Sequence, residues 1–343
     1  MDLTLGAEQE AIRDAIRDLL HARSPLARVR AVMAEEPGVD AAVWREAAEL
    51  GWFALGLPEA AGGAGYGLPE EMLLFVELGR ALPPGPWLGT VLGAHALAGA
   101  ADLRSVHEAL LAGTHRVAVI DDPGDTLGAG ARLEGTATRI ADGGHADGFV
   151  VVGRTAALYV AGDARGLGRQ AAASIDPTRP LAEVRFAGVS AVPLPADAGL
   201  LRRRGTVLVA AEAVGVAERT LEASVESAKV RQQFGKPIGS FQAVKHRCAD
   251  MAVRAEVARA VTAYAAVAVR DGLDEAARQV HVAKALAVGG AIANATDNVQ
   301  NHGGMGYTWE ADAHLFLKRA WLLEHAFGAR TAHLDALAAP WRA

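Results

Sequence analysis

Three long segments in the second half of the chain have the apolar periodicity of α-helices. They cover residues 207–230, 251–269 and 281–298, and apolar side chains return every three or four positions in each of them. A helix of this length buries its apolar stripe only by packing against other helices of similar length. The sequence from Leu200 onward therefore predicts a helix bundle.

The first third of the chain also has a helical pattern. Residues 8–20 place Ile12 and Ile16 on one face of a helix. The Pro-Pro-Gly-Pro run at residues 83–86 marks a break before a further helix begins. We expect residues 1–115 to form an N-terminal helical domain.

Between these two helical regions the sequence changes to short runs rich in β-forming residues. Such runs occur at residues 117–120, 148–152 and 157–160, and turns with Gly, Asp and Pro separate them. We expect a small β domain at residues 116–198, followed by a C-terminal four-helix bundle at residues 199–343. The predicted fold class is therefore α+β and mostly α.

The composition limits the partners that the chain can have. A chain of 343 residues with 51% hydrophobic residues can bury a large core, and a net charge of -6 argues against nucleic acid as a general partner. No apolar run approaches the ~18 residues that a membrane helix needs, and the start of the chain lacks a signal-peptide pattern. The single cysteine, Cys248, excludes an internal disulfide and fits a reducing compartment, so we expect a cytoplasmic protein.

Two motifs in the helical second half carry a family resemblance. One is Arg-Gln-Gln-Phe-Gly-Lys-Pro-Ile at residues 231–238, and the other is Gln-Asn-His-Gly-Gly-Met-Gly-Tyr-Thr-Trp-Glu at residues 300–310. Together they resemble the C-terminal domain of acyl-CoA dehydrogenases, which are FAD-dependent enzymes with the three-part layout predicted above. The N-terminal third shares shorter stretches with the same family, at residues 50–53, 57–59, 62–66 and 77–80.

The resemblance implies FAD as the cofactor, and it implies that the bundle lends FAD-binding residues to a neighbouring subunit. A guanidinium pairs with a diphosphate through two parallel hydrogen bonds, as an arginine at the FAD pyrophosphate would. Glycines let the backbone approach the cofactor closely, and glutamines supply polar contacts. The matching residues in this chain are Arg231, Phe234, Gln242, Gln300, Gly303 and Gly304.

The catalytic base of the family has no counterpart in this chain. Acyl-CoA dehydrogenases remove a weakly acidic α-proton from an acyl-CoA thioester, which requires a positioned carboxylate. The residue that matches the family's catalytic glutamate is Phe327, which accepts no proton. Some family members place the base on the first long helix of the bundle, but the matching residues here are Gly205 and Thr206.

Two other carboxylates are candidates for the missing base. Glu212 is a weak one, because a carboxylate among small apolar residues can act as a base, although a hydrogen bond between helices is the more common role of such a residue. Glu324 lies nearly one turn before Phe327, and its helical position predicts a solvated face.

The β domain also departs from the family pattern. Residues 121–126 stand where the family has a loop with Gly and Ser, and residues 139–147 stand where it has a tryptophan-centred segment against the flavin. Neither feature is found, and no tryptophan occurs between Trp87 and Trp309. We expect an eroded flavin pocket in this β domain.

Other kinds of catalytic site have no support in the sequence. The 11 histidines form no His-x₃-His pair with a third ligand in view, so we predict no metal site. No Ser-His-Asp, P-loop or Cys-x-x-Cys arrangement is recognisable.

Three hypotheses follow from the resemblance. In the first, the chain is a subunit without the base, similar to the short subunit of heterotetrameric acyl-CoA dehydrogenases in bacterial steroid side-chain degradation. It would then need a second acyl-CoA dehydrogenase subunit, an acyl-CoA substrate and an acceptor such as an electron-transfer flavoprotein. In the second, it is a self-sufficient homotetramer in which Glu212 or another carboxylate acts as the base. In the third, it is a scaffold without redox chemistry.

Overall fold

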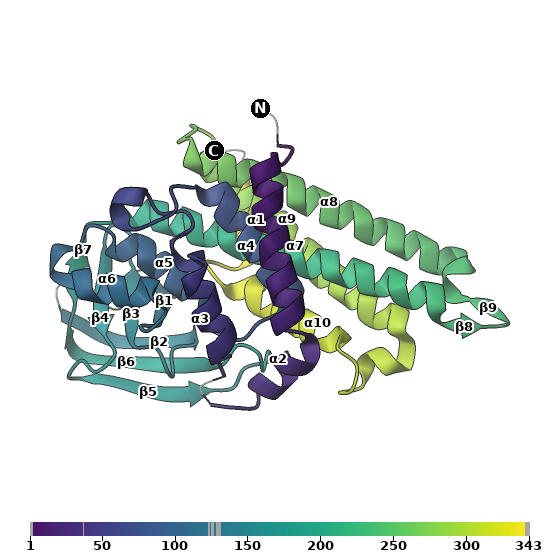
Figure 1. The fold of residues 1–343 in the computed structure, drawn as a ribbon, viewed down its shortest axis with the longest axis horizontal. Helices are drawn as coiled ribbons and strands as arrows, with labels where there is room; N and C mark the ends of the chain where they lie inside the picture. Colours follow the sequence, from purple (N-terminus) through teal and green to yellow (C-terminus); the bar gives the residue numbers. More distant parts are fainter. Residues whose placement is uncertain (1–2, 37, 123, 125–126, 128–131, 340–343) are drawn as a thin grey trace. The chain divides into compact units, whose positions relative to one another are not determined.

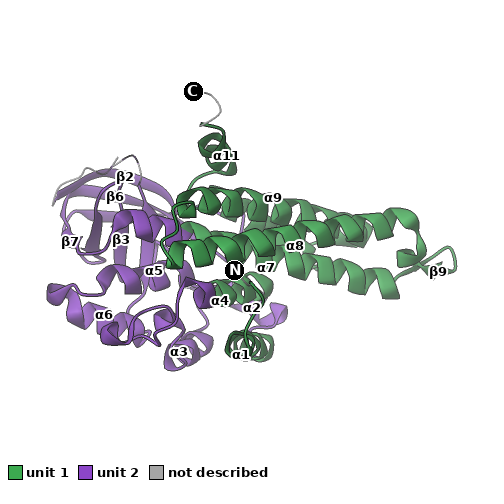
Figure 2. Ribbon diagram, turned by 90° about the horizontal axis from the view of Figure 1, so that it is seen from above, with its two compact units in different colours: residues 1–22, 72–82, 206–343 green, residues 23–71, 83–205 purple. Residues whose placement is uncertain are grey.

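The structure is a computed structural model. It describes residues 3–36, 38–122, 124, 127 and 132–339. By their internal contacts these residues divide into two compact units, each made of discontinuous segments (Figure 2). Unit 1 comprises residues 1–22, 72–82 and 206–343, and unit 2 comprises residues 23–71 and 83–205. The three sequence ranges 1–115, 116–198 and 199–343 stay a prediction.

Unit 1 is almost entirely helical (Figure 1). The predicted long helices are confirmed as α7, α8 and α9. Helix α9 packs against α8, α10 and α11. The elements of unit 1 are nearly all of α1 (Ala7–Arg23), the later part of α4 (Leu68–Ala81), most of α7 (Ala198–Val230), β8 (Gln232–Gln233), β9 (Lys236–Pro237), η4 (Ile238–Ser240), α8 (Gln242–Arg270), α9 (Ala276–His302), η5 (Gly303–Tyr307), α10 (Ala313–His325) and α11 (Arg330–Ala338).

Helices α4 and α7 cross with their backbones in contact inside unit 1. A Cβ atom added at Gly79 would overlap the carbonyl oxygen of Glu212, and one added at Gly215 would overlap the carbonyl oxygen of Val76. A glycine on each helix allows this approach, because it places no Cβ atom between the two backbones. The crossing therefore fixes the position of Glu212 on α7.

Unit 2 contains the β strands and the remaining helices. The predicted strands are confirmed as β1, β3 and β4. The elements of unit 2 are α2 (Leu26–Val32), α3 (Ala41–Glu49), η1 (Trp52–Ala54), η2 (Glu59–Ala61), α5 (Trp87–Leu97), η3 (Ala101–Leu103), α6 (Arg104–Leu111), β1 (Val117–Asp121), β2 (Arg132–Ala141), β3 (Gly148–Val152), β4 (Ala157–Ala161), β5 (Leu167–Ala172), β6 (Leu181–Ser190) and β7 (Val192–Leu194).

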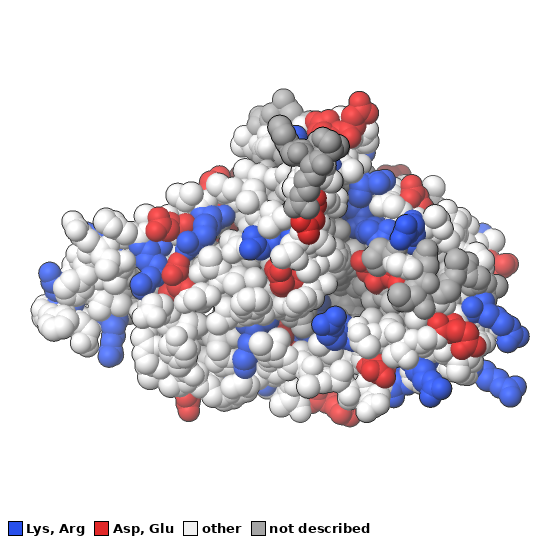
Figure 3. All heavy atoms as spheres, turned by 180° about the vertical axis from the view of Figure 1, so that it is seen from behind, with Lys and Arg blue, Asp and Glu red and all other residues white. Residues whose placement is uncertain are grey.

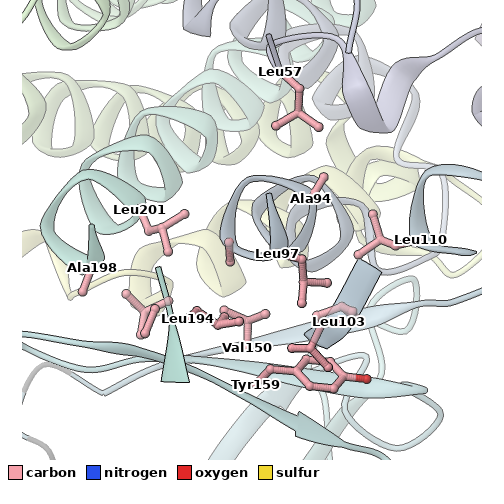
Figure 4. Close-up of a cluster of buried hydrophobic side chains, with 14 of the residues drawn as sticks. Leu57, Ala94, Leu97, Leu103, Leu110, Val150, Tyr159, Leu194, Ala198 and Leu201 are labelled. Carbon is pink, nitrogen blue, oxygen red and sulfur yellow. The ribbon is translucent and has the colours of Figure 1, made fainter. Parts of the chain in front are cut away.

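The strands form two sheets that share one core. The first has the order β1-β3-β4-β7, with β1 and β3 parallel, and the second has the antiparallel order β2-β6-β5. Strand β3 is buried on both faces: Val150 packs with Leu97 and Leu201 in one cluster (Figure 4), while Phe149 packs with Phe186 in the other. Burial on both faces explains the uninterrupted apolar run of β3.

The second sheet was not predicted from the sequence. In β6 the buried residues Val184 and Phe186 alternate with the exposed residues Glu183 and Arg185. This is the period of two that a sheet with one solvated face requires. The charged residues between the apolar ones hide such a strand from a search for apolar runs.

The close crossing of α4 and α7 generates a stability prediction. We expect Gly215→Ala to lower the free energy of unfolding by about 2–3 kcal/mol, because the new methyl group meets backbone atoms that cannot rotate away. Urea denaturation of the purified chain measures the change. Gly144→Ala is the control, because a Cβ there meets no atom within 4 Å. Equal stability of the two variants would contradict the crossing.

Candidate functional site

The first motif forms the turn that follows α7. The helix ends at Val230, and the amide of Ile238 then donates a hydrogen bond of 2.8 Å to the carbonyl oxygen of Arg231, which closes the β8–β9 hairpin. The hairpin projects from one end of the long helices of unit 1 (Figure 2). Its geometry leaves the Arg231 side chain exposed, and it makes no hydrogen bond or ion pair among the residues that the structure describes.

Phe234 has an unusual position at the turn of this hairpin. Its backbone is left-handed, with φ of 54°, and its side chain is 90% exposed. Its ring and the Phe241 ring are nearly perpendicular, with 6.0 Å between centroids, and the ammonium of Lys236 lies 4.5 Å from the Phe241 ring. Strained backbone and exposed aromatic surface are features found at many binding sites.

An apolar groove runs beside the hairpin. It has a volume of about 430 Å³ and lies between the end of α7 and the start of α8. Its lining residues include Val225, Pro237, Val244 and Cys248. The first motif therefore places an exposed guanidinium and an apolar surface in a single region.

The second motif lies at the C-terminal end of α9, close to the N-terminal half of α8. Arg247 on α8 donates a hydrogen bond of 2.9 Å to the Asn301 side chain on α9, which holds these two helix ends together. Gln242 begins α8 and Gln300 lies in the last turn of α9, and both are exposed. The structure thus brings the two glutamines of the prediction to the same end of the bundle.

The two glycines of the second motif end helix α9. Gly303 has φ of 62°, which lets the chain leave the helix, and Gly304 follows it in η5. Both are exposed, and a Cβ at either position would meet no atom within 4 Å. Their backbone is therefore open to a ligand.

The turn at Phe327 is closed and buried. Its side chain is 8% exposed, and its backbone is left-handed, with φ of 52°. The Nε2 atom of His333 donates a hydrogen bond of 2.9 Å to the carbonyl oxygen of Phe327. The Nδ1 atom of neutral His333 is then an acceptor, so His281 donates to it across 2.8 Å.

Lys284 holds the same turn from α9. Its ammonium lies in the interior and donates hydrogen bonds to the carbonyl oxygens of Leu323, Glu324 and Gly328 at 3.0, 3.3 and 2.9 Å. These carbonyls surround the C-terminal end of α10, where backbone acceptors lack helical partners. Burial lowers the pKa of Lys284 to about 8. In the sequence, Lys284 is the one lysine among the mostly small and apolar residues of 281–298, and this pattern could have indicated a buried lysine.

Glu212 lies in a buried ion pair. Its carboxylate accepts a hydrogen bond from the Arg319 guanidinium on α10, and both side chains are shielded from solvent. A carboxylate paired in this way serves the helix-to-helix role that the sequence offered as the alternative to a base. Arg319 was not singled out from the sequence.

Of the remaining positions considered for the base, two carry no carboxylate. Gly205 and Thr206 are both buried in α7. Glu324 is half-buried rather than on a solvated face, because its Oε1 atom accepts a hydrogen bond of 3.2 Å from the Arg330 amide at the start of α11. The expectation for Glu324 was therefore wrong, since the carboxylate caps the next helix.

The segments that differ from the family lie in unit 2. Residues 123, 125 and 126 of the first segment fall outside the described residues, while the Asp122 carboxylate accepts a hydrogen bond of 2.9 Å from the Leu127 amide. In the second segment Arg139 has φ of 58° at an irregularity in the pairing of β2 with β6. The expected loss of the flavin pocket stays a prediction.

A cleft of unit 2 contains none of the predicted site residues. It has a volume of about 840 Å³ and lies near the start of β1 and the end of β4. His115 lines it and shares a hydrogen bond of 3.0 Å with the Tyr159 hydroxyl, and Arg116 is paired with Asp147. Burial lowers the pKa of His115 and raises that of Tyr159 to about 12, so both side chains are neutral near neutral pH.

Searches for two other kinds of feature give negative results within the described part of the chain. No group of three or more His, Cys, Asp or Glu side chains there is placed to hold a metal ion. None of the helices described is both long and apolar enough to cross a membrane.

Family comparisons agree with this fold. The acyl-CoA dehydrogenase N-terminal domain model matches residues 6–104, and the C-terminal domain model matches residues 200–340. The chain therefore belongs to the acyl-CoA dehydrogenase family, whose members are oxidoreductases that use FAD.

Three similar proteins define its place more closely. Acyl-CoA dehydrogenase IpdE2 of Mycobacterium tuberculosis is 38% identical over 93% of this chain and 92% of its own length. FadE34 of the same species is 37% identical over 93% of this chain but only 46% of its own length. A structure of the Tcur3481-Tcur3483 steroid ACAD superposes with a TM-score of 0.89 at 28% identity, covering 99% of both chains.

The exposed residues of unit 1 fit a phosphate-bearing dinucleotide such as FAD. Arg231 offers a guanidinium without a partner among the described residues, and Gly303 and Gly304 offer backbone without a side chain in the way. The groove beside the hairpin offers apolar surface. FAD supplies the hydride acceptor of the family when it is bound.

The Glu212–Arg319 pair allows a test that separates structure from catalysis. We expect Glu212→Met to lower the free energy of unfolding by about 3–5 kcal/mol, because it removes the carboxylate that pairs with the buried Arg319 guanidinium. The double variant Glu212→Met/Arg319→Met recovers most of that loss. Urea denaturation of the chain measures stability, and acyl-CoA oxidation by the chain together with a base-bearing subunit measures activity. Full activity of the folded double variant excludes Glu212 as the base and leaves a structural pair.

The His333 turn predicts a pH dependence of stability. Burial lowers the pKa of His333 to about 4, so the unfolded chain binds its proton first as the pH falls. The contribution of neutral His333 to the stability of the fold is complete above the ordinary histidine pKa of about 6.5. It is lost as the pH falls toward the pKa of about 4 in the folded chain. Between about pH 7 and about pH 5, the free energy of unfolding of the wild type falls by about 2 kcal/mol more than that of His333→Gln, a variant that keeps an N–H donor. Exposed His21→Gln, the control, follows wild type, and parallel curves for all three would refute the assignment.

Proposed function

We propose that this chain is the subunit without the catalytic base in a two-subunit, FAD-dependent acyl-CoA dehydrogenase. The observation that carries the proposal is the buried turn at Phe327. The residue at the family's glutamate position has no proton-accepting group, and hydrogen bonds from His333 and Lys284 occupy the carbonyls around it. The two-protein name of the Tcur3481-Tcur3483 structure and the length of FadE34 support a second subunit, because more than half of FadE34 lies outside the match.

The two subunits would divide the work of the reaction. The partner would supply the glutamate that removes the α-proton of an acyl-CoA thioester, while the hydride leaves the β-carbon. This chain would hold the cofactor at the subunit junction. Arg231 would bind the diphosphate and Phe234 would pack against a ring. The predicted glutamines would make polar contacts and the two glycines backbone contacts.

The remaining parts of the proposal concern substrate, acceptor and compartment. The steroid ACAD name of the structural neighbour supports a steroid-derived acyl chain. An electron-transfer flavoprotein or a similar acceptor would reoxidise the enzyme, and a heterotetramer would be the assembly. The single cysteine is compatible with a reducing cytoplasm.

Co-expression tests the proposed function directly. The partner is a separately encoded acyl-CoA dehydrogenase subunit with glutamate at the position that matches Phe327. We expect the purified pair to be yellow, heteromeric and active with acyl-CoA, and this chain alone to be inactive. Flavin absorbance, native mass and acyl-CoA oxidation give the three readings. A yellow homotetramer of this chain that oxidises acyl-CoA unaided would exclude the proposal.

The role of Arg231 predicts a specific loss of flavin. We expect Arg231→Gln to weaken FAD binding to the complex by about 10- to 100-fold, which is the range for a charge-assisted, two-bonded contact. Arg231→Lys keeps the positive charge but loses the pair of parallel N–H donors, so its affinity for FAD should lie between those of the wild type and Arg231→Gln. Flavin fluorescence during titration of the apo-complex measures the dissociation constant. Arg45→Gln, an exposed arginine on α3, is the control and should leave it unchanged.

A further inference from the structure

An exposed group of aromatic side chains follows the second motif in unit 1. Tyr307, Trp309 and Trp321 are 77%, 55% and 46% exposed. Trp44, Trp52 and Trp87 are instead buried in unit 2. Large exposed aromatic residues are enriched at protein interfaces and rare elsewhere on a surface. We call Tyr307, Trp309, His314, Lys318 and Trp321 the aromatic patch.

The Trp309 ring is held in place before any partner binds. The His314 ring stacks on it at 4.8 Å between centroids and 21° between planes, and the Lys318 ammonium lies 4.7 Å from its centre. His314 also donates a hydrogen bond of 3.3 Å to the Trp309 carbonyl oxygen. A side chain that is already ordered loses little entropy on binding, which is the property of a strong anchor.

Helix α10 presents the rest of the patch on one side. His314, Lys318 and Trp321 are four and three residues apart, so they share a face of the helix. Tyr307 ends the short helix η5, which begins with Gly303 and Gly304 of the candidate cofactor site. The aromatic patch is therefore continuous in the chain with the residues that would meet a neighbouring subunit.

We propose that the aromatic patch is the docking surface for the base-bearing subunit, with Trp309 as its anchor. The inference rests on the proposed function and adds the surface that recognises the partner. The continuity with the cofactor motif selects this occupant, because the same subunit would meet Gly303 and Gly304. The chemistry agrees, since permanent interfaces are rich in Trp and Tyr.

Two other occupants have weaker support. A transient electron acceptor usually meets a small interface through charged residues, whereas the patch is formed mainly by rings. Over the face shown in Figure 3, acidic and basic side chains are interspersed rather than gathered into one field. A second copy of this chain would also cover the patch, but it would bring a second Phe327 instead of a base.

The test measures the dissociation constant of the co-purified two-subunit complex. We expect Trp309→Ala to weaken the complex by roughly thirtyfold, the loss typical of a hot-spot residue. Trp309→Phe keeps an aromatic ring, so it should weaken the complex less than Trp309→Ala does. Dilution followed by mass photometry gives the constants, and flavin content is recorded separately. Leu50→Ala is the matched control, because Leu50 is 58% exposed but lies in unit 2.

The possible outcomes separate this inference from the proposed function. Weakening by Trp309→Ala, with the Leu50→Ala complex unchanged, supports the docking surface. An unchanged constant in both Trp309→Ala and Trp321→Ser overturns it, even if the wild-type complex is yellow and active. An intact complex that reduces its electron acceptor more slowly assigns the patch to the acceptor and also overturns it. If the wild-type chains never associate, the proposed function fails, and this inference fails with it.

Discussion

The backbones of α4 and α7 cross so closely at Gly79 and Gly215 that no side chain fits between them. This contact fixes the position of Glu212 on α7 relative to α4. The Glu212 carboxylate then accepts a hydrogen bond from Arg319 on α10. The end of α10 is in turn held by Lys284 from α9. Each step depends on the previous one, so the position of the turn after α10 is set by a glycine crossing elsewhere in unit 1.

That turn is buried and hydrogen-bonded, although Phe327 carries no reactive group. Phe327 has a left-handed backbone, which costs about 1–2 kcal/mol for a residue with a side chain. The buried ring and the hydrogen bond from His333 offset this cost. The carbonyls around it are bonded to Lys284. Phe327 therefore works as a packing element in this turn.

The sequence predicted the helices well because long helices need a repeating apolar stripe, as at residues 281–298. It predicted β3 because both faces of that strand are buried, but it missed β6, in which charged residues alternate with apolar ones. It named six exposed residues in or beside the two motifs through their resemblance to a family. It did not find Arg319 or His333, because their roles depend on contacts with residues more than fifty positions away or beyond a turn.

The two parts of the candidate site differ in how their polar groups are satisfied. Around Phe327 the carbonyls, the lysine and the histidines satisfy one another in the interior. At the β8–β9 hairpin the Arg231 side chain is exposed without a partner among the described residues, and Phe234 pairs a strained backbone with an exposed ring. Strain and exposed apolar surface cost free energy in the isolated chain, and binding to another surface offsets that cost. The hairpin therefore has the properties of a half-site completed from outside, and the Phe327 turn has those of a closed core.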